Sequence, residues 1–395
     1  MVTQEIQISP EDENYKDELL SVARAFRNFD DALDEFIVQK GYVGDINDVN
    51  AKVKYIKDRF QEAGIEIESR IVKNWFLNHV QANKRSIAFR FCFAFHLNLE
   101  ETQNFFRRVY LQRGIDCHDM TEAIYYYCIR HQMKFQEAQE LIERVHPNDK
   151  KRALDFNTEI LFTGSIVEEL DRFENAEDLL DFLEKNKEQF VYNNATAYRY
   201  IGQLWKKIDG PEGIANREAK LLFPAQKITE KNRSVESIYH QIFGYKDYDA
   251  NDKNAPLFDI QSDRTLQPIL KDNNLIHPLA RASFPDRQGL EGIIKGNNKS
   301  SEVVRKTMIL LAFYSFWADI CVRNNNLYSE NDGDTERCLS FINKLLLDTG
   351  YPTLYEGNPY DWIFMFAMQD QYPLEAFRFF MRELYLNKIE ESCLQ

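Results

Sequence analysis

Apolar residues recur every three or four positions along most of this chain, and that spacing constrains its fold more than any other feature. Within residues 15–39 it places Leu19, Phe26, Leu33 and Phe36 on one side of an expected amphipathic helix. The 395 residues include only 15 Gly and 11 Pro, which are too few for the many tight turns of a β-rich fold. The sequence therefore predicts an all-α protein built from multi-helix bundles.

Local signals place several further helices. A stripe that starts at Val53 predicts a helix that Gly64 ends, and shorter helices are expected at 71–77 and 86–97. Asn98 and Asp119 are expected to cap the next two helices, because their side chains can accept hydrogen bonds from free backbone amides. Later helices are expected over the ranges 135–145, 166–172, 176–186, 195–208, 301–323, 334–349 and 373–388.

Composition shifts divide the chain into four parts. We expect an N-terminal helical domain at 1–148, an acidic helical bundle at 149–243, an irregular connector at 244–300 and an aromatic-rich helical bundle at 301–395. The connector is rich in Pro, Asn and Asp, and its length indicates a functional loop. In the last part, the aromatic residues are expected to form a core, with a partner groove as the alternative. These residues are Trp362, Phe364, Phe366, Phe377, Phe379, Phe380 and Tyr385.

Charge and cysteine usage bear on the compartment. The net charge of −14 disfavours nonspecific contact with nucleic acid or anionic lipid, although a local basic face remains possible. The six cysteines are scattered and several lie in apolar runs, which favours free thiols over a disulfide framework. No apolar stretch reaches the ~20 residues of a membrane span. We therefore expect a cytoplasmic protein that does not enter the membrane.

One local pattern stands out between residues 52 and 105. A short polar-faced helix around Trp75 is followed by a polar turn, by an apolar helix at 86–97, and by Leu97-Asn-Leu99-Glu-Glu. This pattern resembles the Cro/repressor class of helix-turn-helix domains. A departure is that Glu66 and Glu68 occupy the place where that class has a small-residue turn.

The resemblance implies a recognition helix at 69–78 that would contact duplex DNA. Between 52 and 91 there are nine Lys or Arg against four Asp or Glu, a local excess of 9 − 4 = 5 positive charges. A fainter copy lies at 281–315, where residues 281–306 hold six basic side chains against three acidic ones. The candidate nucleic-acid-binding residues are Arg70, Lys73, Asn74, Lys84, Arg85, Arg287, Lys295 and Lys299. The alternative is a helical corner that only packs the core.

The chain as a whole is also similar to uncharacterised helical proteins of Gram-positive anaerobes. The similarity lies in three stretches: Cys117-His-Asp-Met-Thr-Glu-Ala-Ile-Tyr-Tyr-Tyr127, Asn194-Ala-Thr-Ala-Tyr198 and Asn358-Pro-Tyr-Asp-Trp362. It implies no assigned activity.

The sequence contains no phosphate-binding glycine loop, nucleophile elbow or His-Glu-x-x-His zinc motif. Cys117, His118, Cys128 and His131 have zinc-type side chains at poor spacing, so packed thiols and surface histidines are expected instead of a metal site. No cofactor is expected.

Three classes of function follow from these observations. The first is a non-catalytic, DNA-associated regulatory protein. The second is an interaction or scaffold protein that binds a protein partner or itself and does not bind nucleic acid. The third is an enzyme with a site near His277 and Arg281 in the connector, where a histidine and an arginine could serve acid–base chemistry.

Overall fold

The structure is a computed structural model of the chain, and it confirms the all-α prediction: the described residues form helices and contain no strand. Of these helices, none is both long and apolar enough to cross a membrane. The described residues are 9–24, 26, 29–77, 85–145, 163–191, 194–222, 234–244, 287–297, 300–324 and 333–381.

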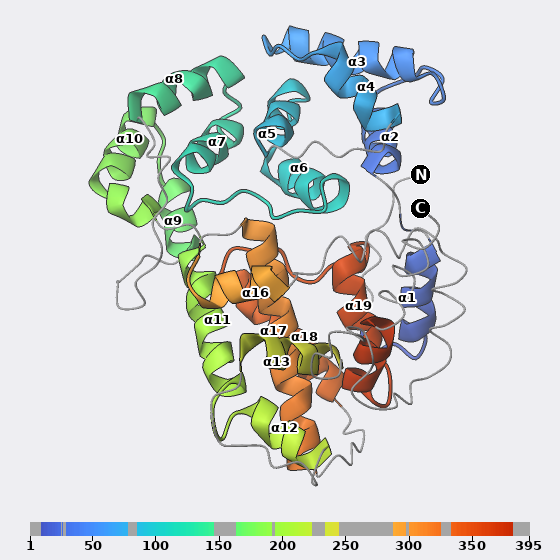
Figure 1. Cartoon of the computed structure of the whole chain (residues 1–395). Helices are drawn as coiled ribbons and strands as arrows, with labels where there is room; N and C mark the ends of the chain where they lie inside the picture. Colours follow the sequence, from blue (N-terminus) through green and yellow to red (C-terminus); the bar gives the residue numbers. More distant parts are fainter. Residues whose placement is uncertain are drawn as a thin grey trace. The chain divides into compact units, whose positions relative to one another are not determined.

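The chain divides into two compact units, which Figure 1 shows in the colours of the sequence. The N-terminal unit consists of Arg27–Thr196 and Asp348–Pro352. The C-terminal unit consists of Met1–Phe26, Ala197–Leu347 and Thr353–Gln395. The four-part division expected from the sequence groups the residues differently, and most of its connector, 245–286, lies outside the described residues.

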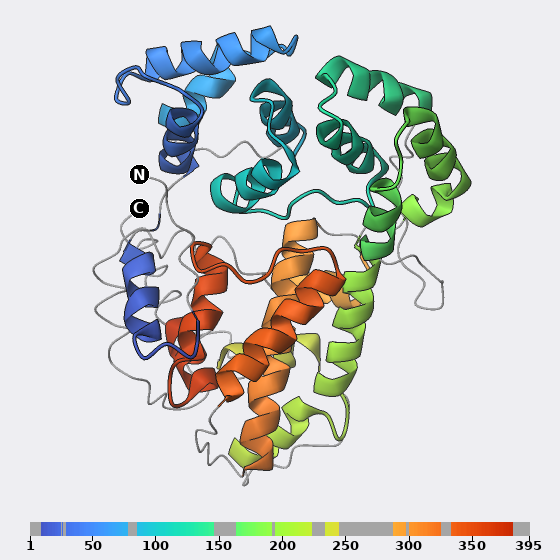
Figure 2. The ribbon, with the colours of Figure 1, turned by 180° about the vertical axis from the view of Figure 1, so that it is seen from behind.

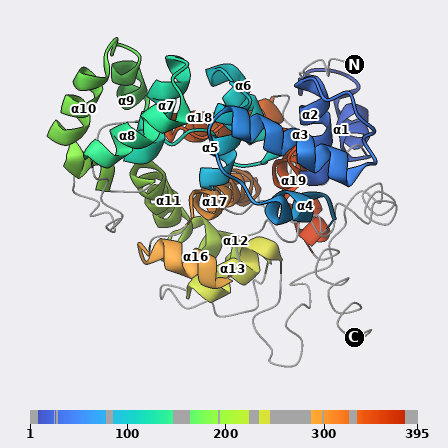
Figure 3. The ribbon, with the colours of Figure 1, turned by 90° about the horizontal axis from the view of Figure 1, so that it is seen from above.

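Among the helices of the N-terminal unit, seen from above in Figure 3, α3 packs on α4 and α5, α2 contacts α4 and η1, and α8 packs on α7 and α10. Their bounds are α2 Phe29–Gln39, α3 Val49–Glu62, α4 Ser69–Leu77, α5 Arg85–Ala94, α6 Leu99–Asn104, the π-helix η1 Phe105–Val109, α7 Met120–Arg130, α8 Phe135–Val145, α9 Thr163–Leu170, α10 Ala176–Lys185 and the 3-10 helix η2 Lys187–Val191.

Helix ends in this unit follow the local signals of the sequence. Asn98 and Glu101 form a reciprocal capping box at the start of α6, and Asp119 accepts the backbone N–H of Glu122 at the start of α7. Each such cap stabilises its helix by about 1 kcal/mol. Just after α3, Gly64 has a φ of 71°, a left-handed conformation that glycine adopts without strain. The predicted caps and the predicted helix end are confirmed.

Phenylalanine rings fill the core of the N-terminal unit. The ring of Phe91 lies 5.1 to 6.4 Å, between centroids, from those of Phe36, Phe60 and Trp75, and α5 is buried along most of its length. Ring pairs of this kind contribute about 0.5–1.5 kcal/mol beyond the burial of their area. This packing fixes α2, α3, α4 and α5 against one another.

The C-terminal unit is built around α17, whose side chains are buried on most of its circumference. Figure 2 shows α1 beside α19, and the contacts confirm that pairing and the packing of α12 on α17. The bounds are α1 Tyr15–Arg24, α11 Ala195–Ile208, α12 Ile214–Leu222, α13 Val235–Phe243, α16 Arg287–Ile294, α17 Ser301–Arg323, α18 Asp334–Asp348 and α19 Pro359–Ala367. Residues 373–381 are also helical. The predicted aromatic core is confirmed from Trp362 to Phe380, and Tyr385 lies outside the described residues.

The prediction of one helix over 15–39 is wrong, because α1 and α2 are separate helices in different units. In the C-terminal unit, Trp362 Nε1 donates a hydrogen bond to the backbone oxygen of Leu19 at 2.7 Å, and the ring of Phe26 packs edge-on against Trp362. Leu33 and Phe36 lie in the core of the N-terminal unit. The apolar stripe does mark buried residues, but its first half packs in the C-terminal unit and its second half packs in the N-terminal unit.

Candidate functional site

The predicted recognition helix corresponds to α4, which presents two chemically distinct sides. Val72, Trp75 and Phe76 are buried and hold the helix against α2 and α3. Arg70 and Lys73 are exposed, and neither has an ion-pair partner among the residues that the structure describes. They are three residues apart, so they lie on the same side of the helix. We call Ser69, Arg70 and Lys73 the basic face of α4.

The surroundings of this face are mixed. Glu66 and Glu68, in the segment that leads into α4, are exposed. On α4 itself, Asn74 is half-buried, and the side chains of Ile71 and Leu77 are 36 % and 52 % exposed. The helix therefore offers positive charge and apolar surface together.

Arg85, a candidate for phosphate contact, has an internal role in the structure. Its guanidinium donates to both carboxylate oxygens of Glu122, at 2.7 and 2.8 Å, and to the backbone oxygens of Arg113 and Gly114, at 2.9 and 2.7 Å. It also lies over the ring of Phe106. With its donors used in this way, Arg85 does not belong to the basic face of α4.

The fainter helix-turn-helix copy is only partly described. Lys295 follows α16 and forms an exposed ion pair with Glu291, with 2.6 Å between Nζ and Oε1. Arg287 begins α16, but the structure does not describe its side chain. Lys84, Lys299, His277 and Arg281 lie outside the described residues. The two groups of candidate residues belong to different units.

A buried polar network occupies the other part of the N-terminal unit, around the non-helical segment 111–119. Arg113 Nη1 donates to Asp116 Oδ2 at 2.8 Å and to Asn194 Oδ1 at 2.9 Å, and Nη2 donates to the backbone oxygen of Thr349 at 3.2 Å. The guanidinium lies over the ring of Tyr351, whose hydroxyl donates to the same Asn194 oxygen at 2.8 Å. Asn194 has a φ of 55°, a region in which asparagine is enriched among non-glycine residues.

The pKa values of the two carboxyl groups in this network, those of Asp116 and Glu122, are shifted in opposite directions. Burial alone would raise the pKa of Asp116, but the charge of Arg113, the nearby His118 with its backbone N–H, and the charge of Arg85 together hold that pKa below its usual value. Burial raises the pKa of Glu122, and the attraction of Arg85 only partly offsets this. The backbone N–H of Asp116 donates to Glu122 Oε2 at 2.7 Å, which joins the two groups. The opposite shifts arise because positive charge and a hydrogen bond outweigh burial at Asp116, whereas burial outweighs the effect of Arg85 at Glu122.

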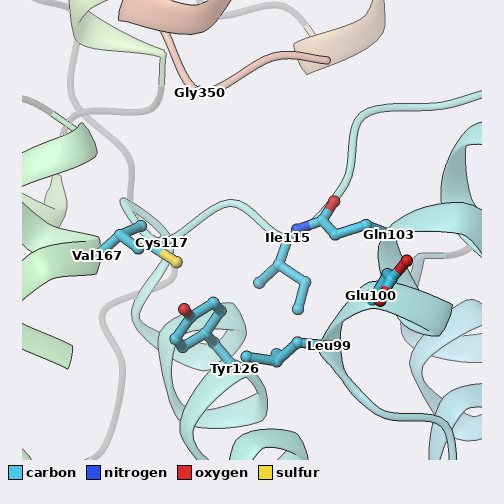
Figure 4. Close-up of a pocket in the computed structure, with 8 residues that line it drawn as sticks. All are labelled: Leu99, Glu100, Gln103, Ile115, Cys117, Tyr126, Val167 and Gly350. Carbon is cyan, nitrogen blue, oxygen red and sulfur yellow. The ribbon is translucent and has the colours of Figure 1, made fainter. Parts of the chain in front are cut away.

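A cavity of about 290 Å³ lies beside this network, inside the N-terminal unit (Figure 4). Its apolar walls are Leu99, Ile115, Cys117, Val167 and the ring of Tyr126. Glu100 and Gln103 of α6 lie on the side opposite Cys117 and Val167, and Gly350 completes the lining. Segment 111–119 thus serves two purposes, because Arg113 and Asp116 build the network while Ile115 and Cys117 line the cavity.

The zinc-type residues Cys117, His118 and Cys128 are packed in the interior of the N-terminal unit. Cys117 and Cys128 are buried, as predicted, and burial raises the pKa of both thiols. The prediction of a surface position is wrong for His118, which is 3 % exposed, because the backbone N–H of His118 is tied to Asp116 Oδ1 and the residue is turned inward. Across the described ranges, no three His, Cys, Asp or Glu side chains are grouped to hold a metal ion.

Sequence reasoning missed both the network and the cavity. The signal present in the sequence was a polar run, Arg113-Gly-Ile-Asp116-Cys-His-Asp119, just before the apolar helix α7. Its partners, Asn194, Thr349 and Tyr351, are far away in the chain, so no local pattern could supply them.

The chain was also compared with known proteins. No protein-family model, no curated protein and no solved structure matches it.

Proposed function

We propose that the protein is a DNA-associated regulatory protein that contacts duplex DNA through the basic face of α4. The observation that carries the proposal is the division of α4 into a buried side that includes Trp75 and an exposed side with Arg70 and Lys73. A helix that enters a groove of DNA needs this division, because one side must be held rigidly while the other reaches phosphates and base edges.

The electrostatics set the form that this binding takes. The net charge of −14 repels DNA at long range, and Glu66 and Glu68 add local repulsion. Binding therefore depends on a few close contacts, and it falls as salt screens them. Ser69 adds a hydroxyl that can donate to a phosphate, and the half-buried Asn74 sits at the edge of the face.

The test is the affinity of the full chain for random duplex DNA over a salt series from about 50 to 200 mM. We expect Arg70→Glu/Lys73→Glu to weaken binding strongly. If both residues contact phosphates, the slope of log affinity against log salt should flatten by about 2.

The matched control is Arg172→Glu/Lys185→Glu, which changes the net charge equally at exposed positions of the same unit. It should bind DNA almost as well as the parent chain. If both double variants lose the same amount of DNA affinity, the loss comes from the overall charge and not from the basic face of α4. No binding of the parent chain at low salt would overturn the proposal.

The second candidate is a protein-binding surface, and the exposed apolar side chains favour it. Ile71 and Leu77 of α4 are 36 % and 52 % exposed, and Val38 and Val43 are 50 % and 98 % exposed in the same unit. Exposed apolar groups of this kind are frequent at interfaces. Ile71→Ser/Leu77→Ser should then abolish self-association, measured by analytical ultracentrifugation. A parent chain that stays monomeric would exclude self-association through this surface.

A further inference from the structure

We propose that the cavity between α6, α7, α9 and segment 111–119 binds a small primary amine with an apolar body about the size of one aromatic ring. The inference does not depend on the proposed contact between α4 and DNA. It rests on the division of the cavity into an apolar part and one acidic end.

The size and the walls of the cavity define the body of the ligand. The volume of about 290 Å³ lies at the lower end of the ~300–1,000 Å³ that small-molecule sites span. Leu99, Ile115 and Val167 offer aliphatic surface. Tyr126 offers its ring, because its hydroxyl already donates to Asp171 Oδ1 at 2.8 Å. A compact apolar group gains favourable transfer energy when it enters such a site.

Cys117 contributes to the apolar wall and does not act as a nucleophile. Burial raises the pKa of its thiol well above the usual value, so the thiol stays protonated and weakly reactive. The ligand is therefore held by noncovalent contacts alone.

The polar end of the cavity defines the charge of the ligand. Glu100 carries the one formal charge among the lining side chains, and Gln103 beside it adds an amide oxygen that can accept a hydrogen bond. An ammonium group can donate to both oxygens while its apolar body lies between α7 and α9. A carboxylate in the same place would be repelled by Glu100.

The buried network prepares the cavity for binding. Arg85 donates hydrogen bonds to the backbone oxygens of Arg113 and Gly114. Arg113 donates to the carboxylate of Asp116 and to the backbone oxygen of Thr349, the residue before Gly350 in the cavity lining. Two sections of the cavity wall, 113–117 and 349–350, are therefore fixed by ion pairs and hydrogen bonds inside the protein. A wall that is already ordered loses little conformational entropy when a ligand binds.

The experiment uses 2-phenylethylamine as the probe and measures its binding to the full chain by saturation-transfer NMR and by titration. 3-Phenylpropionate serves as the probe of similar shape and opposite charge. We expect the amine to bind and the carboxylate to fail.

Three variants locate the site. Val167→Trp fills the cavity from α9 and should abolish binding of the amine, with folding checked by circular dichroism. Glu100→Gln should weaken binding about threefold to tenfold, because an exposed charge-assisted hydrogen bond is lost. Glu143→Gln, an equal charge change on an exposed part of α8, should leave binding unchanged.

The exposed Glu100→Gln variant keeps the test decisive even if Val167→Trp does not fold. Absence of amine binding to the parent chain, or equal binding in a folded Val167→Trp variant, would overturn the proposal. Equal binding of the amine and the carboxylate would overturn the assigned charge.

Discussion

Each unit contains a deeply buried arginine–aspartate pair, and the two pairs lie in different structural settings. In the C-terminal unit, Arg305 of α17 and Asp361 of α19 form a two-point ion pair, with N–O distances of 2.8 and 2.7 Å and side chains that are 3 % and 0 % exposed. Both residues lie on helices. In the N-terminal unit, Arg113 and Asp116 form an equally buried pair within a segment that has no regular structure.

This difference indicates what each pair does. The pair in the C-terminal unit ties together α17 and α19, two helices that satisfy most of their own backbone groups, and Asp361 also accepts the backbone N–H of Tyr355 at 3.0 Å. The irregular segment 111–119 lacks the regular hydrogen bonds of a helix. Arg85 donates to the backbone oxygens of Arg113 and Gly114 in this segment, and Arg113 joins the segment to the backbone oxygen of Thr349. The first pair fixes how helices pack, and the second fixes the course of a chain segment that lines a cavity.

The largest effect is expected for Arg305→Ala. Removing the guanidinium leaves the carboxylate of Asp361 buried without its cation, which should lower the free energy of unfolding by about 3–5 kcal/mol. Urea denaturation measures the change, and hydrogen exchange of α17 and α19 assigns it to the C-terminal unit. Lys295→Ala breaks an exposed pair in the same unit and should cost less than about 1 kcal/mol. Similar losses in both variants would contradict the assigned role of the buried pair.

A smaller effect, about 2–3 kcal/mol, is expected for Arg113→Ala. Both carboxylates keep one backbone N–H, from His118 for Asp116 and from Tyr355 for Asp361, but Asp116 also keeps the attraction of the Arg85 charge, so less of the cost of a stranded charge remains. Hydrogen exchange should rise in segment 111–119 and around Thr349 but not in α3. A loss equal to that of Arg305→Ala, with no local change in exchange, would remove the distinction between the two pairs.

The same distinction explains which parts of the structure the sequence could predict. The helices α8 and α17 match the predicted ranges 135–145 and 301–323, because periodicity and capping are local properties. The prediction of a single helix over 15–39 failed, because periodicity shows which side of a helix is buried but not in which of the two cores that side packs.

The candidate sites follow the same rule. The basic face of α4 could be predicted, since exposure on a helix follows from its pattern. Arg85 has the same charge and a similar sequence context, but its partner Glu122 is 37 positions away, so its internal role could not be predicted. The cavity unites Leu99, Val167 and Gly350, and only the folded chain brings them together.

An intermediate effect, on pH dependence, is expected for Glu122→Gln. Burial raises the pKa of Glu122 above its usual value of 4.5 despite the opposing effect of Arg85. Between 4.5 and the raised pKa, the folded chain holds a proton that the unfolded chain has released, so the free energy of unfolding falls as pH rises. Asp116 has the opposite sign: its lowered pKa gives stability that is lost as pH falls below 3.8.

The Glu122→Gln substitution removes the titration of Glu122 and keeps that of Asp116. Urea denaturation at a series of pH values just above 4.5 should therefore show a flatter pH dependence for Glu122→Gln than for the parent chain. The loss of stability at lower pH should persist, because Asp116 still titrates. A steeper dependence in the variant would contradict the raised pKa of Glu122.

The smallest effect is expected for Tyr351→Phe, which removes only the hydroxyl of the network. Asn194 Oδ1 loses the hydrogen bond from Tyr351 but keeps the one from Arg113, so the free energy of unfolding should fall by about 0.5–1.5 kcal/mol. The phenylalanine ring still lies under the guanidinium, 4.4 Å from its centre, and preserves the cation–π contact. The matched control is Tyr198→Phe in the C-terminal unit, which removes the hydrogen bond from the Tyr198 hydroxyl to the backbone oxygen of Asn297.

The comparison between these two variants decides which group organises the segment. If the guanidinium of Arg113 does so, both hydroxyl deletions cost about the same, and hydrogen exchange in segment 111–119 stays close to that of the parent chain. If Tyr351→Phe instead costs as much as Arg113→Ala and exposes the segment, the hydroxyl and Asn194 hold the irregular backbone. The ion pair would then resemble the one in the C-terminal unit, which ties together parts that are already ordered.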